Sequence, residues 1–185
     1  MEYQTSIKND NKFSNEGNQL SETWIPPNQN QYKINCCSAF DRGKGGIGVG
    51  IIIRNSKGEI MASSAQTIEA SFSLKMRQLL AIKKSILFGM DCGLAPILVE
   101  TNESSVVVKW LCDGSHKEFE NGVILDEIAN MMHVGNGIVV NNVSIMANMP
   151  AAVLAKEALK ISEDTFWMEE CPPFFNNLVM DDMPV

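Results

Sequence analysis

Two kinds of hydrophobic pattern follow one another along the chain and predict an α/β fold. Residues 32–40, 47–54 and 59–68 are rich in apolar and β-branched residues and are separated by short turns that contain glycine. This pattern predicts three strands in an antiparallel meander. Apolar residues then recur at helical spacing from Phe72 to Met90, which predicts one long helix that ends before Gly93.

The second half of the chain alternates between strand and helix patterns. Residues 97–101 and 137–146 are rich in valine and isoleucine and predict strands, whereas residues 103–112 and 123–132 predict helices. Pro150 suits the first turn of a last helix that runs to about residue 162, with Asn148 or Met149 near its cap. The order β-β-β-α-β-α-α-β-α predicts a mixed five-stranded sheet with flanking helices, in which the fourth strand pairs in parallel through a right-handed crossover.

The two ends of the chain differ in composition from the part between them. Residues 1–23 are rich in Asn, Gln, Ser, Glu and Lys, which predicts a disordered polar tail. Two prolines within residues 24–27 favour an extended approach to the first strand. We therefore expect one domain over residues 24–162, followed by a C-terminal tail, residues 163–185, with aromatic and acidic residues.

Charge and cysteine content limit the function classes. The formal net charge of −7 argues against strong non-specific binding to phosphate backbones, although a local basic groove remains compatible with it. No signal peptide and no apolar run of the ~20 residues needed to span a bilayer is visible. The five cysteines are odd in number and form no C-x-x-C pair, which favours reduced thiols and an intracellular, nuclear or cytoplasmic location.

Several short motifs occur in an order and spacing that are highly specific in combination. They are WIPP at 24–27, KINC at 33–36, GGIGV at 45–49, IRNSKGE at 53–59, VET at 99–101, VVV at 106–108, LAK at 154–156 and WMEE at 167–170, followed by Pro173-Phe174. In this order they resemble the plant-type ribonuclease H-like domain, which is related to the ribonuclease H segment of reverse transcriptases. The resemblance covers about residues 24–180.

This resemblance implies a site for two Mg²⁺ ions about 4 Å apart, which clamp the attacking water and the leaving oxygen of a phosphodiester. The family holds the ions with an Asp on strand one, a Glu on the first helix, an Asp ending strand four, and an Asp or His on the last helix. The corresponding positions here are Cys37, Gln78, Asn102 or Glu103, and Ala152. The choice between Asn102 and Glu103 depends on whether the alignment is anchored on residues 99–101 or on residues 106–108.

These replacements predict that hydrolysis is lost. Neutral amides do not balance a dication as carboxylates do, and a thiol is a soft ligand poorly matched to Mg²⁺. We therefore expect a ribonuclease H-like domain that binds RNA–DNA hybrid or RNA weakly, or a protein, and that needs no cofactor. Lys83 and Lys84 are candidate phosphate contacts, although two such lysines more often form a solvated helix face.

Two alternatives stay open. The first is an active RNA–DNA hybrid ribonuclease that uses Mg²⁺ or Mn²⁺ with a substitute carboxylate such as Glu103. The second is a protein-interaction scaffold or a decaying gene copy. Because neighbouring strand residues face opposite sides of a sheet, Cys36 and Cys37 are expected to divide between the core and the implied site.

Overall fold

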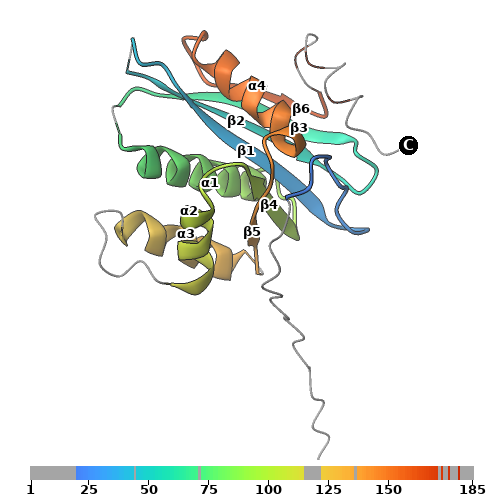
Figure 1. Ribbon diagram of the computed structural model, residues 1–185. Coiled ribbons are helices and arrows are strands. Elements are labelled where there is room, and N and C mark those ends of the chain that lie inside the picture. The colour runs from blue at the N-terminus through green and yellow to red at the C-terminus, as the bar shows by residue number, and fades with distance from the viewer. Residues whose placement is uncertain are drawn as a thin grey trace, which may run out of the picture.

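A six-stranded mixed sheet with helices on both faces forms the centre of the described part of the chain (Figure 1). The computed structural model describes residues 20–43, 45–70, 72–114, 122–135 and 137–170, together with residues 172, 175 and 179. The strand order is β5-β4-β1-β2-β3-β6. The elements are β1 (Tyr32–Phe40), β2 (Ile47–Arg54), β3 (Ile60–Ile68), α1 (Leu74–Asp91), β4 (Ile97–Thr101), α2 (Ser105–Asp113), α3 (Gly122–Val134), β5 (Val139–Asn142), the short 3-10 helix η1 (Met146–Asn148), α4 (Met149–Ala158) and β6 (Thr165–Met168).

The predicted meander and the predicted parallel pairing are both confirmed. Strand β2 pairs antiparallel with β1 and β3, and β4 pairs in parallel with β1 and β5. The β2–β3 turn is fixed locally, because the side-chain oxygen of Asn55 accepts hydrogen bonds from the backbone N–H groups of Lys57 and Glu59 at 2.9 and 3.0 Å. Gly58 has a φ of 81°, which a residue with a side chain would adopt only with strain.

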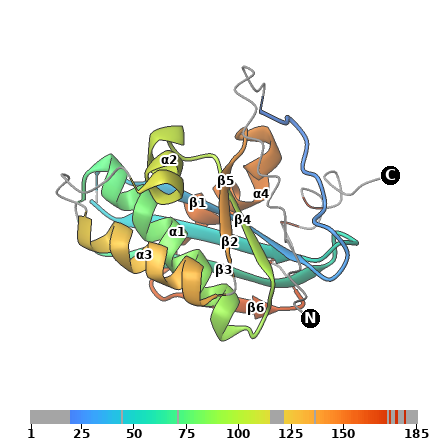
Figure 2. The same cartoon turned by 90° about the horizontal axis from the view of Figure 1, so that it is seen from below.

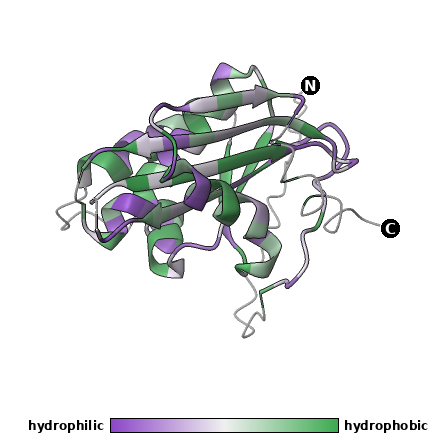
Figure 3. Cartoon of the chain, turned by 90° about the horizontal axis from the view of Figure 1, so that it is seen from above, coloured by the Kyte–Doolittle hydropathy of each residue, from purple (hydrophilic) through white to green (hydrophobic). Residues whose placement is uncertain are grey.

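Helices α1, α2 and α3 cover one face of the sheet, and α4 covers the other (Figure 1). Seen from below, α1 and α3 lie across the strands (Figure 2). The larger core lies on the α1 face, where alternate positions of the central strands, Ile34, Ile51 and Ile53 among them, are fully buried against helix residues such as Leu79 and Ile82. The strands in Figure 3 accordingly carry hydrophobic stretches, whereas the helices are mixed in colour.

Helix α4 packs on the sheet at backbone contact distance. An ideal Cβ placed on Gly48 would lie 2.0 Å from the carbonyl oxygen of Ala155, and one placed on Gly50 would lie 2.2 Å from that of Ala151. No side chain fits at either position, so these two glycines allow the close approach. The glycine-containing part of β2 therefore packs directly against the backbone of α4.

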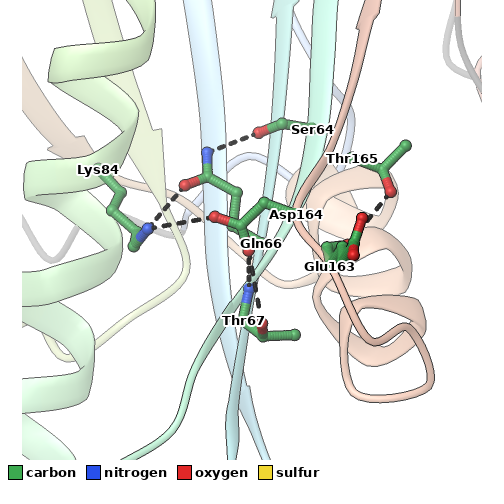
Figure 4. Close-up of polar contacts among 7 residues, drawn as sticks. All are labelled: Ser64, Gln66, Thr67, Lys84, Glu163, Asp164 and Thr165. Atoms are coloured by element: carbon green, nitrogen blue, oxygen red, sulfur yellow. Dashed lines mark hydrogen bonds and ion pairs between the residues drawn. The ribbon is translucent and has the colours of Figure 1, made fainter.

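The α/β class and the element order are confirmed, but the predicted count of five strands was one too few. The sixth strand, β6, pairs with β3 and lies in the segment expected to be a C-terminal tail. Asp164 fixes its start, because its Oδ1 accepts a hydrogen bond from the backbone N–H of Thr67 at 2.7 Å (Figure 4). Four residues alternating between half-buried and exposed give too short a pattern to distinguish a strand from a tail.

Several predicted boundaries move by a few residues. Helix α4 ends at Ala158 rather than near residue 162, and β5 is shorter than the predicted strand 137–146. The predicted disorder of the N-terminal tail falls mainly on residues 1–19, which lie outside the described residues. Within the described ranges, no helix is long and apolar enough to cross a membrane.

Candidate functional site

Adjacent cysteines on β1 face opposite sides of the sheet, as predicted. Cys36 is fully buried on the α1 face, where Ser85 and Thr101 lie beside its thiol. Cys37 is 6% exposed and belongs to the apolar cluster under α4. Cys37, at the implied strand-one position of the family site, therefore faces α4.

A side-chain amide bridges β4, β1 and α4 beside Cys37. The Nδ2 of Asn148 donates hydrogen bonds to the carbonyl oxygen of Cys36 at 2.9 Å and to Oδ1 of Asn102 at 2.5 Å. Asn102 lies beside the thiol of Cys37, and this thiol donates to the backbone carbonyl of Ser38 at 3.6 Å. Asn148 is fully buried and is the N-cap residue of α4, but its side chain makes this bridge instead of capping the helix.

Glu103 reaches β1 one residue further along. Its Oε1 accepts hydrogen bonds from both the backbone N–H of Ser38 at 2.8 Å and the Ser38 hydroxyl at 2.5 Å. The loop that carries Glu103 is held by Asn142 of β5, whose Nδ2 donates to the backbone carbonyls of Thr101 and Glu103 at 3.2 and 2.5 Å. Asn102 and Glu103 thus both converge on β1, Asn102 at Cys37 and Glu103 at Ser38.

The other two family positions are also buried. Ala152 is 5% exposed and shares the apolar cluster of Cys37, together with Phe175 and Val179 near the C-terminus. Gln78 lies in α1 and is 5% exposed, and its Oε1 has no hydrogen-bond partner among the residues that the structure describes. The structure therefore groups Cys37, Asn102, Glu103 and Ala152 at the β1–α4 contact and places Gln78 on the helix that covers the opposite face.

Burial keeps both β1 thiols protonated. Desolvation raises the pKa of Cys36 to about 12, with a smaller contribution from the Glu103 carboxylate. Desolvation, and secondly Glu103, also raises the pKa of Cys37. Since the thiolate is the nucleophile and the metal ligand, neither cysteine is prepared for either role at neutral pH.

The donor set does not fit a pair of Mg²⁺ ions. Among the family positions, Glu103 offers the one carboxylate, and Asn102 already shares its oxygen with Asn148. Ala152 offers no ligand, and protonated Cys37 offers a soft sulfur where a hard cation prefers oxygen. Within the described ranges, no three His, Cys, Asp or Glu side chains are grouped so as to hold a metal ion.

The lysines proposed as phosphate contacts make ion pairs within the chain. Lys83 Nζ lies 2.7 Å from Glu127 Oε2 of α3. Lys84 Nζ lies 2.8 Å from Gln66 Oε1 and 3.8 Å from Asp164 Oδ2, so it joins α1 to β3 and to the segment before β6 (Figure 4). Both lysine side chains are about a third exposed, at 31% and 29%.

A groove of ≈ 710 Å³ lies away from these residues. It is bounded by the β1–β2 turn, the end of β3 and the turn after α4, with Asp41, Thr67 and Ile161 among its lining residues. None of the family positions lines it. The size of this groove is therefore no reason to place the implied metal-dependent hydrolysis there.

Sequence reasoning missed two residues that organise the site. Ser38 was not predicted as a site residue, yet it holds the Glu103 carboxylate by two hydrogen bonds. Asn142 was not singled out, although it fixes the β4–α2 loop. A polar residue at the end of a short apolar strand was the available signal for Asn142, but its contacts 39 and 41 residues away are not visible locally.

The sheet consists of an antiparallel meander extended by the parallel strands β4 and β5, with α1–α3 on one face and α4 on the other. This is a ribonuclease H-like fold. The chain is similar to the N-terminal RNase H domain of rv2228c from Mycobacterium tuberculosis at 17% identity and a TM-score of 0.59, over 70% of this chain and 94% of that one. It is similar to LC11-RNase H1, isolated from compost, at 18% identity and a TM-score of 0.58, over 71% and 97%. RNase H1 from Halobacterium salinarum gives 21% identity and a TM-score of 0.56, over 70% and 96%.

The chain belongs to the reverse transcriptase-like family of RNase H domains. The family model, described as "Reverse transcriptase-like", matches residues 35–158, which run from β1 to the end of α4. No curated protein sequence matches the chain.

Proposed function

We propose that this domain binds RNA–DNA hybrids without hydrolysing them. The observation that supports this proposal is the hydrogen bond from Asn148 to Asn102 beside the Cys37 thiol, at the positions where the family holds metal ions with carboxylates. Removing several groups that act as a unit leaves little of the catalysis they perform together. Binding through backbone and shape contacts does not depend on those groups in the same way.

The proposed ligand follows from the fold relatives. LC11-RNase H1 and a foamy viral protease–reverse transcriptase have each been solved in complex with RNA/DNA hybrid. We extend the ligand class, and not the activity, to this chain. We expect weak binding, because the net charge is −7 and the ammonium groups of Lys83 and Lys84 already make ion pairs.

We also propose that binding needs no metal and takes place in the nucleus or cytoplasm. Cys36, Cys37, Cys92 and Cys112 are all free thiols, which supports a reducing compartment. A hybrid-binding isotherm measured with Mg²⁺ and with a chelator should therefore agree once ionic strength is matched.

A paired binding and cleavage assay on the full chain tests the function. A labelled RNA–DNA hybrid is titrated at low salt, and the same hybrid is incubated with Mg²⁺ or Mn²⁺. We expect retention that weakens as salt rises, and an uncut RNA strand. Failure to bind at low salt would remove the proposal, because backbone binding is strongest there.

The second candidate is a hydrolase that depends on Glu103. It is favoured by one specific observation, namely that two donors of Ser38 hold the Glu103 carboxylate beside Cys37. Cleavage of the hybrid that disappears in Glu103→Gln and persists in a Glu127→Gln control would establish this candidate and overturn the first. Glu127 suits the control because it is half exposed on α3 and pairs with Lys83.

A further inference from the structure

The outer edge of the sheet at β6 presents two exposed apolar side chains. Strand β6 is the last strand in the sheet order, next to β3 (Figure 2). Phe166 and Met168 are 52% and 57% exposed, whereas Trp167 between them is half-buried in the cluster under α4. Because strand residues alternate between faces, Phe166 and Met168 lie on the α1 face, where the Phe166 ring centroid is 5.6 Å from that of Phe88.

The same two residues direct their backbone polar groups away from the sheet. The N–H of Glu169 donates to the carbonyl of Met61 at 2.9 Å, so these two residues form a hydrogen-bonded pair at the end of the β3–β6 ladder. Such pairs alternate with non-bonded pairs along an antiparallel ladder, and the β3–β6 register is continuous. Every second residue of β6 therefore bonds to β3, whereas the N–H and C=O groups of Phe166 and Met168 face the open edge.

The residues of β6 itself do not protect this edge. Natural edge strands avoid unwanted pairing through a proline, a bulge or a charged side chain within the strand. The β6 sequence, TFWM, contains neither proline nor charge, and its pairing with β3 shows no bulge. Among the described residues near the C-terminus, Phe175 and Val179 pack with Trp167 in the cluster under α4, on the face opposite to Phe166 and Met168.

Carboxylates flank β6 at both ends. Glu163 and Asp164 precede the strand, Glu169 and Glu170 follow it, and all four residues are exposed. Asp164 lies 3.8 Å from Lys84 (Figure 4). The three glutamates make no ion pair within the described part of the chain. The edge therefore combines an apolar centre with acidic ends, on a chain whose net charge is −7.

A second copy of this chain is a poor partner for the edge. If Phe166 paired antiparallel with Met168 of a second copy, Asp164 of each chain would lie opposite Glu170 of the other. Like charges directly opposite one another destabilise a pair of strands, whereas opposite charges stabilise it. The charge pattern therefore favours a different protein, in which lysines or arginines flank a short apolar segment.

We propose that β6 is a docking edge for an extended basic segment of a partner protein, which adds a seventh strand to the sheet. The backbone of the segment pairs with the outward N–H and C=O groups of Phe166 and Met168, and its apolar side chains pack on these two residues. Its cations lie opposite the flanking carboxylates. In strand addition of this kind the backbone hydrogen bonds give affinity and the side chains give specificity. The edge uses neither Cys37 nor Asn102, so this interaction is independent of hybrid binding.

Two synthetic peptides, KKVTVTVKK and EEVTVTVEE, test the proposal on the full chain. In fluorescence anisotropy at low salt, we expect the basic peptide to bind at least tenfold more tightly than the acidic one, and its binding to weaken as salt rises. A basic peptide that is N-methylated at its five central residues keeps the charge but donates no backbone hydrogen bonds there, so it should lose at least tenfold in affinity. No binding of the basic peptide, or equal binding of its methylated form, would overturn the proposal.

Met168→Pro removes one outward N–H group without breaking the ladder to β3. Proline is tolerated on edge strands where the N–H faces solvent, so we expect a folded protein that binds the basic peptide at least tenfold more weakly than the wild type. Met168→Thr is the matched control, because it shortens the side chain but keeps the N–H, and it should lose less than threefold. Equal binding by wild type and folded Met168→Pro would contradict strand addition.

Reversing the charge at one end of β6 tests the choice of a basic partner. In Glu169→Lys/Glu170→Lys, we expect the preference for the basic over the acidic peptide to fall at least tenfold. Glu22→Lys/Glu127→Lys has the same net charge, with both changes outside β6 and its flanks, and it should keep the wild-type preference. Equal falls in the two double variants would mean that net charge, and not the edge, selects the peptide.

Two measurements on the wild-type chain need no variant that folds. The amides of Phe166 and Met168, followed by hydrogen exchange in NMR spectra, should exchange more slowly when the basic peptide is bound, and unchanged exchange would refute pairing at β6. Sedimentation of the chain alone should show a monomer. A dimer whose formation slows exchange of the same two amides would assign the edge to a second copy and overturn the proposed partner.

Discussion

Asn148 donates a hydrogen bond of 2.5 Å to the side-chain oxygen of Asn102, joining the start of α4 to the end of β4. In a cluster of carboxylates this contact would be repulsive without a cation. Here the amide of Asn148 donates to the amide oxygen of Asn102, so the contact is favourable without a cation. The same amide also reaches the Cys36 carbonyl, so the β1–β4–α4 junction is held by N–H groups of the chain itself.

Asn148→Ala should therefore destabilise the domain by about 2–4 kcal/mol, because it leaves the Cys36 carbonyl and the Asn102 oxygen buried without their donor. Urea unfolding followed by circular dichroism measures the change. Asn141→Ala is the matched control, since Asn141 is exposed on β5 and should cost less than about 0.5 kcal/mol. Equal effects of the two variants would show that the bridge adds nothing.

Local patterns were sufficient for the order of elements and for the meander. Residues 47–53 are β-branched or glycine, and Asn55 with Gly58 defines the turn that follows, so each prediction depended on neighbours in the chain. Strand β6 could not be predicted in the same way. Its position depends on the contact between Asp164 and Thr67, which are 97 residues apart. Such a contact is not visible in the hydrophobic pattern of the strand itself.

The grouping of Asn102 and Glu103 near β1 could be predicted from the resemblance, but their contacts could not. Asn102 and Glu103 are adjacent in a loop, and a shift of one residue in the alignment exchanges them. In the folded chain the loop is fixed by Asn142 and Ser38, which direct the two side chains to different residues of β1. Tertiary hydrogen bonds decide which side chain reaches which residue of β1, so motif spacing alone could not distinguish Asn102 from Glu103.

Restoring a carboxylate on β1 should lower stability when metal is absent. In Cys37→Asp the new charge is nearly buried beside Glu103, so we expect a loss of about 2–4 kcal/mol at pH 7 in chelator. Burial raises the pKa of such a carboxyl in the folded state. The loss should therefore be full at neutral pH and vanish as pH falls below the unfolded value of about 4.

Cys37→Ser is the control, because it changes the same atom without adding a charge. Calorimetric melting of both variants at pH 7 and at pH 4 measures the difference. A Cys37→Asp protein as stable at pH 7 as Cys37→Ser would mean that the junction tolerates a charge, and it would favour the hydrolase alternative.

Alkaline pH should destabilise the protein through its two β1 thiols. Their pKa values are raised in the folded state, that of Cys36 from 9.0 to about 12. The stability they contribute is complete below pH 9 and is lost as pH rises toward 12, because the unfolded thiols ionise first. Each thiol adds a slope of up to about 1.4 kcal/mol per pH unit in that window.

The slope is measured by urea unfolding of the wild type and of Cys36→Ala/Cys37→Ala between pH 8 and pH 10. Other titrating groups are common to both proteins, so the difference in slope belongs to the thiols. Parallel pH profiles for the two proteins would show that these thiols ionise as readily in the folded state as in the unfolded one.

Gly50→Ala should prevent α4 from packing closely on the sheet. The new Cβ would lie 2.2 Å from the Ala151 carbonyl oxygen and 2.3 Å from the Ala155 nitrogen, and both are backbone atoms of a helix that cannot yield locally. We expect a loss of about 3 kcal/mol or more in free energy of unfolding. Gly46→Ala is the control, because nothing lies within 4 Å of its Cβ position, and it should be neutral. If both variants melt together with the wild type, α4 does not depend on the glycines for its position, and the site at its N-terminus is not fixed by this packing.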